Sequence, residues 1–144
     1  MTLNLVKLCV GVSTLEELEQ WIVEDSRQRR ALGRPDEQIH TTRMFPKRAD
    51  ELLDGGSLYW VIRGNVQVRQ RFVDIRPVTG ADGISRCQLV LEPALKLTQW
   101  QPRRAFQGWR YLQPADAPAD LENEASARAL PQSLRTELAE LGLL

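Results

Sequence analysis

The chain has 144 residues, of which 42% are hydrophobic and 26% are charged. This balance excludes an intrinsically disordered chain, and the length predicts a single domain over residues 1–144. No apolar run approaches the roughly 20 residues needed to span a bilayer, and no secretory leader pattern opens the sequence, so we expect a cytoplasmic protein with no membrane partner.

The formal net charge is zero, but the charge is unevenly distributed. Residues 40–112 contain 12 Lys/Arg and 6 Asp/Glu, whereas residues 1–39 contain 5 and 7, and residues 113–144 contain 2 and 6. A local excess of basic side chains attracts a polyanion even when the whole chain is neutral. The alternative is that the acidic ends fold against the basic middle and neutralise it.

The first part of the chain predicts a strand, a helix, a strand and a short helix. The apolar run at residues 3–12 predicts a buried strand, and Ser13 or Thr14 followed by Glu16 or Glu17 predicts a helix N-terminus. The helical pattern ends at residues 33–35. Residues 38–44 are strand-like, and residues 47–56 predict a short helix closed by glycine.

Residues 55–76 predict a β-hairpin with a two-residue turn at Gly64-Asn65. In that register Trp60 lies opposite Arg69, as a cation–π pair, on a face that also carries Arg71. The other face is expected to belong to the core, and its apolar members are Tyr59, Val61, Val66, Val68 and Phe72.

Two further strands follow, at residues 85–91 and, with a weaker pattern, at residues 95–100. Residues 115–130 are acidic and rich in Pro and Ala, which predicts a mobile acidic loop, and residues 131–144 predict a terminal helix. Helices followed by an antiparallel meander indicate an α+β fold with a mostly antiparallel sheet, an N-terminal helix and a C-terminal helix.

Residues 102–114 interleave arginines with aromatic side chains in the sequence PRRAFQGWRYLQP. Arginine contacts phosphates, and aromatic faces stack on unpaired bases, so the mixture is typical of single-stranded nucleic acid binding. The alternative is that Phe106 and Trp109 anchor a loop on the core, while the arginines pair with the acidic tail.

The titratable residues offer little chemistry. Cys9 and Cys87 lie in apolar runs, where a free thiol usually packs as a small hydrophobe. His40 is the sole histidine and there is no CxxC pair, which excludes a zinc site built from Cys and His ligands. We therefore predict no metal and no cofactor, and we interpret His40 as a structural or surface residue.

These patterns predict a module that binds RNA or a nucleotide-like ligand through a basic aromatic surface. The candidate ligand-binding residues are Trp60, Arg63, Arg69, Arg71, Arg103, Arg104, Trp109, Arg110 and Tyr111. No P-loop, GxGxxG, HExxH or GxSxG motif is present, and no catalytic residue is assigned. Two alternatives remain: a small enzyme that uses a carboxylate on a phosphorylated or nucleobase compound, and a protein-interaction domain.

Two resemblances add to this interpretation. The segments PKRADELLDGGSLYWVIRG, VQVRQR, RPVTG, FQGWRYL and ELAELGLL together resemble the alphaproteobacterial family known as domain of unknown function 1489, which implies one intact domain and adds no catalytic residue. The segment DELLDGGSLYWVIRG followed by VQVRQRFVDI also resembles PUA-like and ASCH-like barrels. That second resemblance implies a small barrel binding RNA or modified bases in a cleft beside it, although Gly56-Ser57 replaces an acidic residue usual there.

Overall fold

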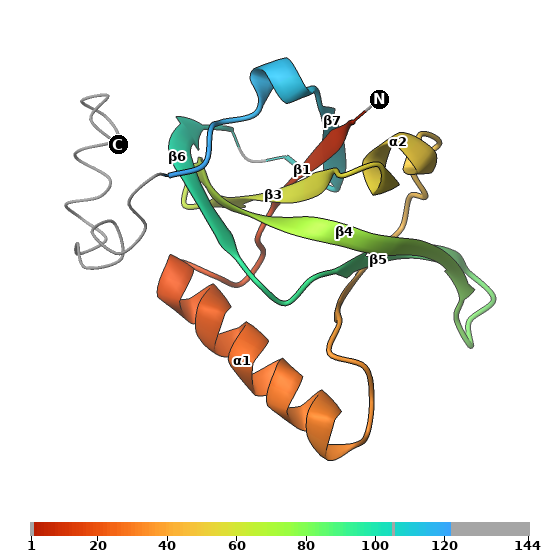
Figure 1. The fold of residues 1–144 in the computed structure, drawn as a ribbon. Coiled ribbons are helices and arrows are strands. Elements are labelled where there is room, and N and C mark those ends of the chain that lie inside the picture. The colour runs from red at the N-terminus through yellow and green to blue at the C-terminus, as the bar shows by residue number, and fades with distance from the viewer. Residues whose placement is uncertain (1, 105, 122–144) are drawn as a thin grey trace.

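The computed structural model describes residues 2–104 and 106–121, and sheet dominates it (Figure 1). The described part contains two α-helices, α1 (Leu15–Ala31) and α2 (Ala49–Leu53), and a 3-10 turn, η1 (Pro114–Asp116). Its seven strands are β1 (Asn4–Leu8), β2 (Gln38–Thr42), β3 (Ser57–Ile62), β4 (Asn65–Thr79), β5 (Ser85–Leu91), β6 (Lys96–Pro102) and β7 (Trp109–Leu112).

The strands form one curved sheet in the order β2-β5-β4-β3-β1-β7, with β6 paired to β4 outside this path. Every pairing is antiparallel except that of β1 with β3, so the prediction of a mostly antiparallel sheet is confirmed. The 15-residue β4 pairs with β6 near its start and with β5 further along. Within the described residues β2 and β7 form no ladder with each other, so the sheet is not a closed barrel.

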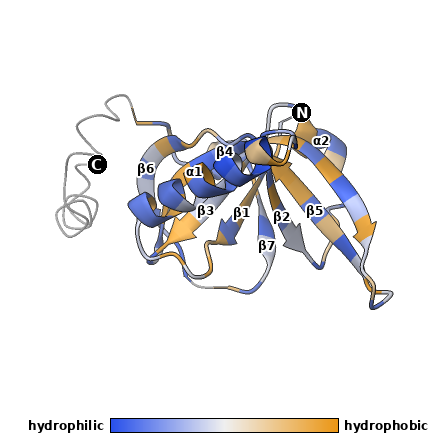
Figure 2. Ribbon diagram, turned by 90° about the horizontal axis from the view of Figure 1, so that it is seen from below, coloured by the Kyte–Doolittle hydropathy of each residue, from blue (hydrophilic) through white to orange (hydrophobic). Residues whose placement is uncertain are grey.

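Helix α1 lies across one face of the sheet (Figure 2). Its start is fixed by a capping box, because Thr14 Oγ1 accepts a hydrogen bond from the backbone N–H of Glu17 at 3.2 Å, and Glu17 Oε2 accepts one from Ser13 N–H at 3.2 Å. The helix ends before Gly33, whose φ of 68° is in the left-handed region. Its buried side chains Leu15, Leu18 and Ile22 pack into the core.

The predicted hairpin is present as β3 and β4, but its predicted register is wrong. The turn residues are Arg63 and Gly64, with φ angles of 50° and 80°, so the turn begins one residue earlier than Gly64-Asn65. This turn alone would place Trp60 opposite Gln67, but the pairing shifts by one residue at an irregularity between Trp60 and Val61. Trp60 therefore lies opposite Val68, and Arg69 lies opposite Tyr59. A one-residue shift moves side chains to the other face, which removes the predicted pairing of Trp60 with Arg69.

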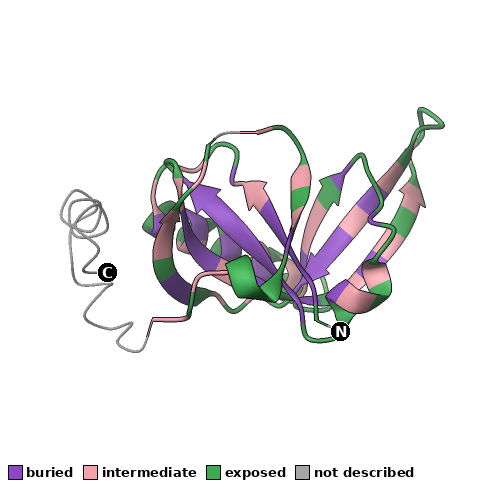
Figure 3. Cartoon of the chain, turned by 90° about the horizontal axis from the view of Figure 1, so that it is seen from above, coloured by how far each residue is buried: buried purple, intermediate pink, exposed green. Residues whose placement is uncertain are grey.

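Both faces of the hairpin are buried (Figure 3). Trp60 is only 4% exposed and joins Val68 and Phe72 in the core that α1 covers. Tyr59, Val61 and Val66 belong to a second cluster, which also contains Val6 and Leu112. The five residues predicted for one core face are therefore all buried, but they are divided between two clusters.

Residues 122–130 of the predicted acidic loop, and the predicted terminal helix at residues 131–144, lie outside the described residues. The described part of the loop lies alongside β6. Gln99 N–H donates to the carbonyl oxygen of Ala119 at 2.8 Å, and Thr98 forms an antiparallel bridge with Asp120. Cys9 and Cys87 are both buried and free, as predicted. No helix in the described part of the chain has the length and apolar character needed to cross a membrane.

Candidate functional site

The inner side of the curved sheet opens between its two end strands, β2 and β7, which lie near each other in Figure 2. The indole N–H of Trp109 in β7 crosses this opening and donates to the carbonyl oxygen of Met44, just after β2, at 2.9 Å. Two hollows meet this region. We call them the aromatic pocket, which includes Cys9, Trp21, Gln38, His40, Trp60 and Gln70, and the basic pocket, which includes Lys7, Thr41, Thr42, Arg43, Trp109 and Arg110.

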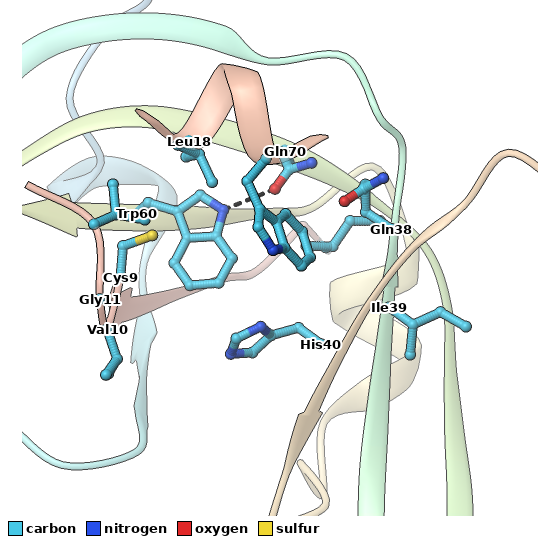
Figure 4. A pocket seen from close by; sticks show the side chains of 12 residues that line it. Cys9, Val10, Gly11, Leu18, Gln38, Ile39, His40, Trp60 and Gln70 are labelled. Carbon is cyan, nitrogen blue, oxygen red and sulfur yellow. Dashed lines mark hydrogen bonds between the residues drawn. The ribbon is translucent and has the colours of Figure 1, made fainter. Parts of the chain in front are cut away.

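The aromatic pocket has a volume of about 310 Å³ and lies between α1 and the sheet (Figure 4). The ring of His40 meets that of Trp60 edge to face, with the centroids 4.9 Å apart and the planes at 82°. Trp21 of α1 also lines the pocket and is 53% exposed, so one indole is buried inside and another faces solvent. Flat aromatic walls of this kind suit a planar ligand.

Two glutamine amides supply polar groups in this pocket. Gln70 Oε1 accepts a hydrogen bond from the Trp60 indole N–H at 2.8 Å, and Gln70 Nε2 donates to the carbonyl oxygen of Glu92 at 2.8 Å. Gln38 Nε2 donates to Asp25 Oδ2 at 2.9 Å. These bonds fix Trp60 and both amides in position.

Three basic residues, Lys7, Arg43 and Arg110, line the basic pocket, which has a volume of about 440 Å³. Arg43 and Arg110 are exposed. Arg110 pairs with Val6, so its side chain leaves β7 on the face opposite to Lys7, where the guanidinium lies 5.1 Å from the centre of the Phe106 ring and donates to the carbonyl oxygens of Gln107 and Trp109, at 3.3 Å each. Thr41 and Thr42 add hydroxyl groups. Among the described residues that line either pocket there is no Asp or Glu.

Lys7 connects the two pockets. In the sheet it is paired with Trp60 of β3 on one side and with Trp109 of β7 on the other. Directly paired residues of neighbouring strands project from the same face, so the three side chains share the inner face of the sheet. The Lys7 side chain therefore lies between a tryptophan of the aromatic pocket and a tryptophan of the basic pocket.

Burial controls the titration of the groups around Lys7. It lowers the pKa of Lys7, an effect that the neighbouring Cys9 opposes. Burial raises the pKa of the Cys9 thiol to about 11, so Cys9 stays protonated at neutral pH and is a poor nucleophile. Burial, with a smaller contribution from the Lys7 charge, lowers the pKa of His40 to about 4, so the imidazole is neutral at pH 7.

Comparison with known proteins gives a family for the chain. Residues 5–144 match the family described as Protein of unknown function (DUF1489). The chain belongs to this family. No curated protein and no solved structure gives a significant match.

Four of the candidate ligand-binding residues lie in or beside the pockets of this DUF1489 chain. Trp60 lines the aromatic pocket, and Trp109 and Arg110 line the basic pocket. Tyr111 lies next to them, with its ring 5.0 Å from that of Trp109, and its hydroxyl accepts a hydrogen bond from the backbone N–H of Arg48 at 3.2 Å.

Arg69 lies elsewhere and has a partner. Its guanidinium makes two hydrogen bonds to the Asp120 carboxylate, at 2.9 and 2.8 Å, and a third to Ser57 Oγ at 2.9 Å. The bond from Arg69, with the arginine's charge, lowers the pKa of Asp120. Arg69 and Asp120 line a third hollow, of about 370 Å³, in which each is the partner of the other.

The remaining four candidate arginines are not among the described lining residues of the aromatic or the basic pocket. Arg63 is exposed in the hairpin turn, Arg71 is exposed on β4, and Arg104 is exposed after β6. Arg103 is half-buried, and its backbone N–H donates to the carbonyl oxygen of Gly64 at 2.8 Å. The structure thus places part of the candidate set at the opening between β2 and β7 and the remainder outside it. Arg63, Arg103 and Arg104 lie near the β3–β4 turn, whereas Arg71 pairs with Ser57 at the end of the hairpin away from the turn.

The sequence interpretation missed Lys7, Trp21, Gln38 and Arg43 as candidates. Lys7, Trp21 and Gln38 were assigned to the correct elements, whereas Arg43, expected within the strand-like residues 38–44, lies just after β2. None of the four was connected to Trp60 or Trp109. The connection depends on β1 lying between β3 and β7, a pairing that no local pattern predicts. One usable signal was Lys7 itself, a basic residue in the middle of the apolar run LNLVKLCVGV.

Proposed function

We propose that the chain binds a nucleotide unit, with the base in the aromatic pocket and the phosphate in the basic pocket. The unit belongs either to single-stranded RNA or to a free nucleotide, because both present a planar base joined to a phosphate. The observation that carries the proposal is the adjacency of an aromatic pocket and a pocket lined by three basic residues, connected through Lys7.

The chemistry of each pocket fits its proposed occupant. Stacking on aromatic side chains stabilises a bound base by about 1–3 kcal/mol, and every base has a face that can stack. Arginine and lysine bind phosphate by charge-assisted hydrogen bonds, to which the hydroxyl of Thr41 adds a further donor, whereas that of Thr42 already donates to the carbonyl oxygen of Met44. A volume of about 310 Å³ is at the small end of ligand pockets, which favours one ring system over an extended ligand.

The likeness to PUA-like barrels supports the same proposal. In such domains RNA or a modified base lies in a cleft beside the barrel, and the opening between β2 and β7 provides a cleft of that kind beside a strongly curved sheet. The resemblance rests on two sequence segments, so it is only an associational argument for function.

Binding is favoured over the carboxylate-based enzyme. That alternative requires an acidic side chain in the ligand pocket, and the described residues lining the aromatic and basic pockets include none. In the third hollow the carboxylate of Asp120 is engaged by Arg69. A carboxylate held in an ion pair is a weak general base, so this hollow does not favour an enzyme.

The test is a titration of labelled single-stranded RNA and, separately, of mononucleotides, followed by tryptophan fluorescence at about 50 and 200 mM salt. Affinity is expected to fall as salt rises, and the double substitution of Arg43→Ala with Arg110→Ala is expected to weaken binding about tenfold or more, because each arginine contributes charge-assisted hydrogen bonds. Binding of the oligomer alone would identify RNA as the source of the nucleotide unit, and binding of both would identify the unit itself.

The matched control is the double substitution of Arg71→Ala with Arg104→Ala, which removes the same charge from exposed positions that do not line these pockets. It is expected to change the affinity less than twofold. Absence of binding at about 50 mM salt, or an equal loss in both double variants, would refute the proposed site.

A further inference from the structure

Gln38 lines the aromatic pocket, and its side-chain amide is held in place by a hydrogen bond from its nitrogen. Its amide oxygen is buried and has no hydrogen-bond partner, and no other described residue that lines this pocket has such an atom. Gln38 is 3% exposed, and its Oε1 atom accepts no hydrogen bond. Burying an acceptor without a donor is unfavourable, so such atoms are rare in folded proteins. A ligand that donates a hydrogen bond to this oxygen would remove the cost.

The orientation of the amide follows from its neighbours on α1. Gln38 Nε2 donates to Asp25 Oδ2 at 2.9 Å, and the same oxygen accepts a bond from Arg29 Nε at 3.0 Å. A carboxylate can only accept, so the amide nitrogen must face Asp25 and the amide oxygen must face away from it. Figure 4 shows the Gln38 oxygen on the side of the pocket occupied by Gln70 and Trp60.

Two of the neighbouring polar groups are already engaged. The Trp60 indole N–H is bound to Gln70 Oε1, and Gln70 Nε2 is bound to the carbonyl oxygen of Glu92. The neutral imidazole of His40, which also lines the pocket, offers one acceptor nitrogen and one N–H donor, whereas Gln38 Oε1 can only accept and has no partner.

We infer that Gln38 Oε1 accepts a hydrogen bond from the exocyclic amino group of the bound base, so that the pocket selects amino-bearing bases over their oxo counterparts. This inference rests on the proposed nucleotide binding and specifies its base. An oxo group at the same place would set two oxygen acceptors against each other, which leaves both unpaired. Asp25 is a positioning residue, because it contacts the Gln38 nitrogen and so determines which end of the amide faces the ligand.

The experiment compares nucleotides that differ by this one group: AMP with IMP, and CMP with UMP. For whichever pair binds, the wild-type chain is expected to prefer the amino-bearing member about tenfold. In Gln38→Leu the preference is expected to fall below about twofold, because the acceptor is gone.

A second variant keeps the test decisive if Gln38→Leu does not fold. In Asp25→Ala the carboxylate that holds the Gln38 nitrogen is gone, so the Gln38 amide can turn either end toward the ligand, and the preference is expected to fall below about twofold. The matched control is Glu24→Ala, which removes a carboxylate from the adjacent exposed residue paired with Arg27. This control is expected to keep the wild-type preference.

The outcomes separate the two proposals. Equal binding of both members of a pair to the wild-type chain overturns the role of Gln38 but leaves nucleotide binding intact. A preference that survives in Gln38→Leu or, if that variant does not fold, in Asp25→Ala has the same meaning. Failure of every nucleotide and of single-stranded RNA to bind overturns both.

Discussion

Replacing Gly56 by alanine is expected to destabilise the fold by about 3 kcal/mol, which lowers the melting temperature by about 10 °C. Gly56 lies where α2, the start of the chain and β3 meet, and its N–H donates to the Leu52 carbonyl oxygen at 2.9 Å. A β-carbon at this position would lie only 2.5 Å from that Leu52 oxygen and would also overlap the Leu3 carbonyl oxygen. Both obstacles are backbone atoms, which cannot move without displacing α2 or β1.

The control for this prediction is Gly33→Ala. Gly33 has a φ of 68°, but no atom lies within 4 Å of the point that its β-carbon would occupy, so alanine there meets only the backbone cost of the left-handed region, about 1–2 kcal/mol. The melting temperatures of the two variants, measured by thermal unfolding, compare the cost of steric crowding at Gly56 with the cost of the left-handed backbone at Gly33. A loss in Gly56→Ala no larger than that in Gly33→Ala would contradict the predicted crowding.

Between pH 6.5 and pH 4 the chain is expected to lose about 3 kcal/mol of stability through His40 alone. Burial, with a smaller contribution from the Lys7 charge, lowers the pKa of His40 from 6.5 to about 4. The unfolded chain takes up this proton near pH 6.5, whereas the folded chain takes it up only near pH 4. The contribution is therefore complete above pH 6.5, declines as the pH falls to 4, and changes no further below that, at about 1.4 kcal/mol per pH unit.

Two measurements check this. His40 is the sole histidine, so its Hε1 proton gives one histidine signal in NMR, which is expected to titrate near pH 4 in the folded chain and near 6.5 in urea. Denaturant unfolding of His40→Gln is expected to show a shallower loss of stability over the same pH range, since carboxylates titrate alike in both proteins. A folded-state midpoint above pH 6 would show that the imidazole is not buried against Trp60.

Sequence patterns predicted an element well where its ends are fixed by residues close together in the sequence. The capping residues Ser13, Thr14 and Glu17 place the start of α1, because the hydrogen bonds that define a helix N-terminus are made within a few residues. The hairpin was likewise predicted, but its turn was placed one residue late. Arg63 adopts a φ of 50°, which is uncommon for a residue other than glycine, so the Gly64-Asn65 pair was the better candidate by sequence alone.

The candidate site could be predicted only in part. Trp109 and Arg110 were selected because aromatic and basic residues interleave in residues 102–114, and Trp60 was selected because the predicted hairpin register set it opposite Arg69. That register is wrong, but all three residues line the pockets at the opening between β2 and β7. The roles of Lys7 and Gln38 come from contacts between distant segments, through the parallel pairing of β1 with β3 and the packing of α1 on β2. A sequence read without an alignment carries no signal for either contact.

The pairing of β1 with β7 also bears on how the chain acquires its site. Asn4 pairs with Leu112, so the two strands that carry Lys7 and Trp109 come from opposite ends of the described chain. Contacts between residues so far apart in sequence require a large loop to close, and they tend to form slowly. Among the described strands β1 is synthesised before the others and β7 after them. The edge of β1 that pairs with β7 therefore stays unpaired until all the other described strands have been made. The arrangement of Trp60, Lys7 and Trp109 on the inner face is therefore complete only once β7 has paired with β1.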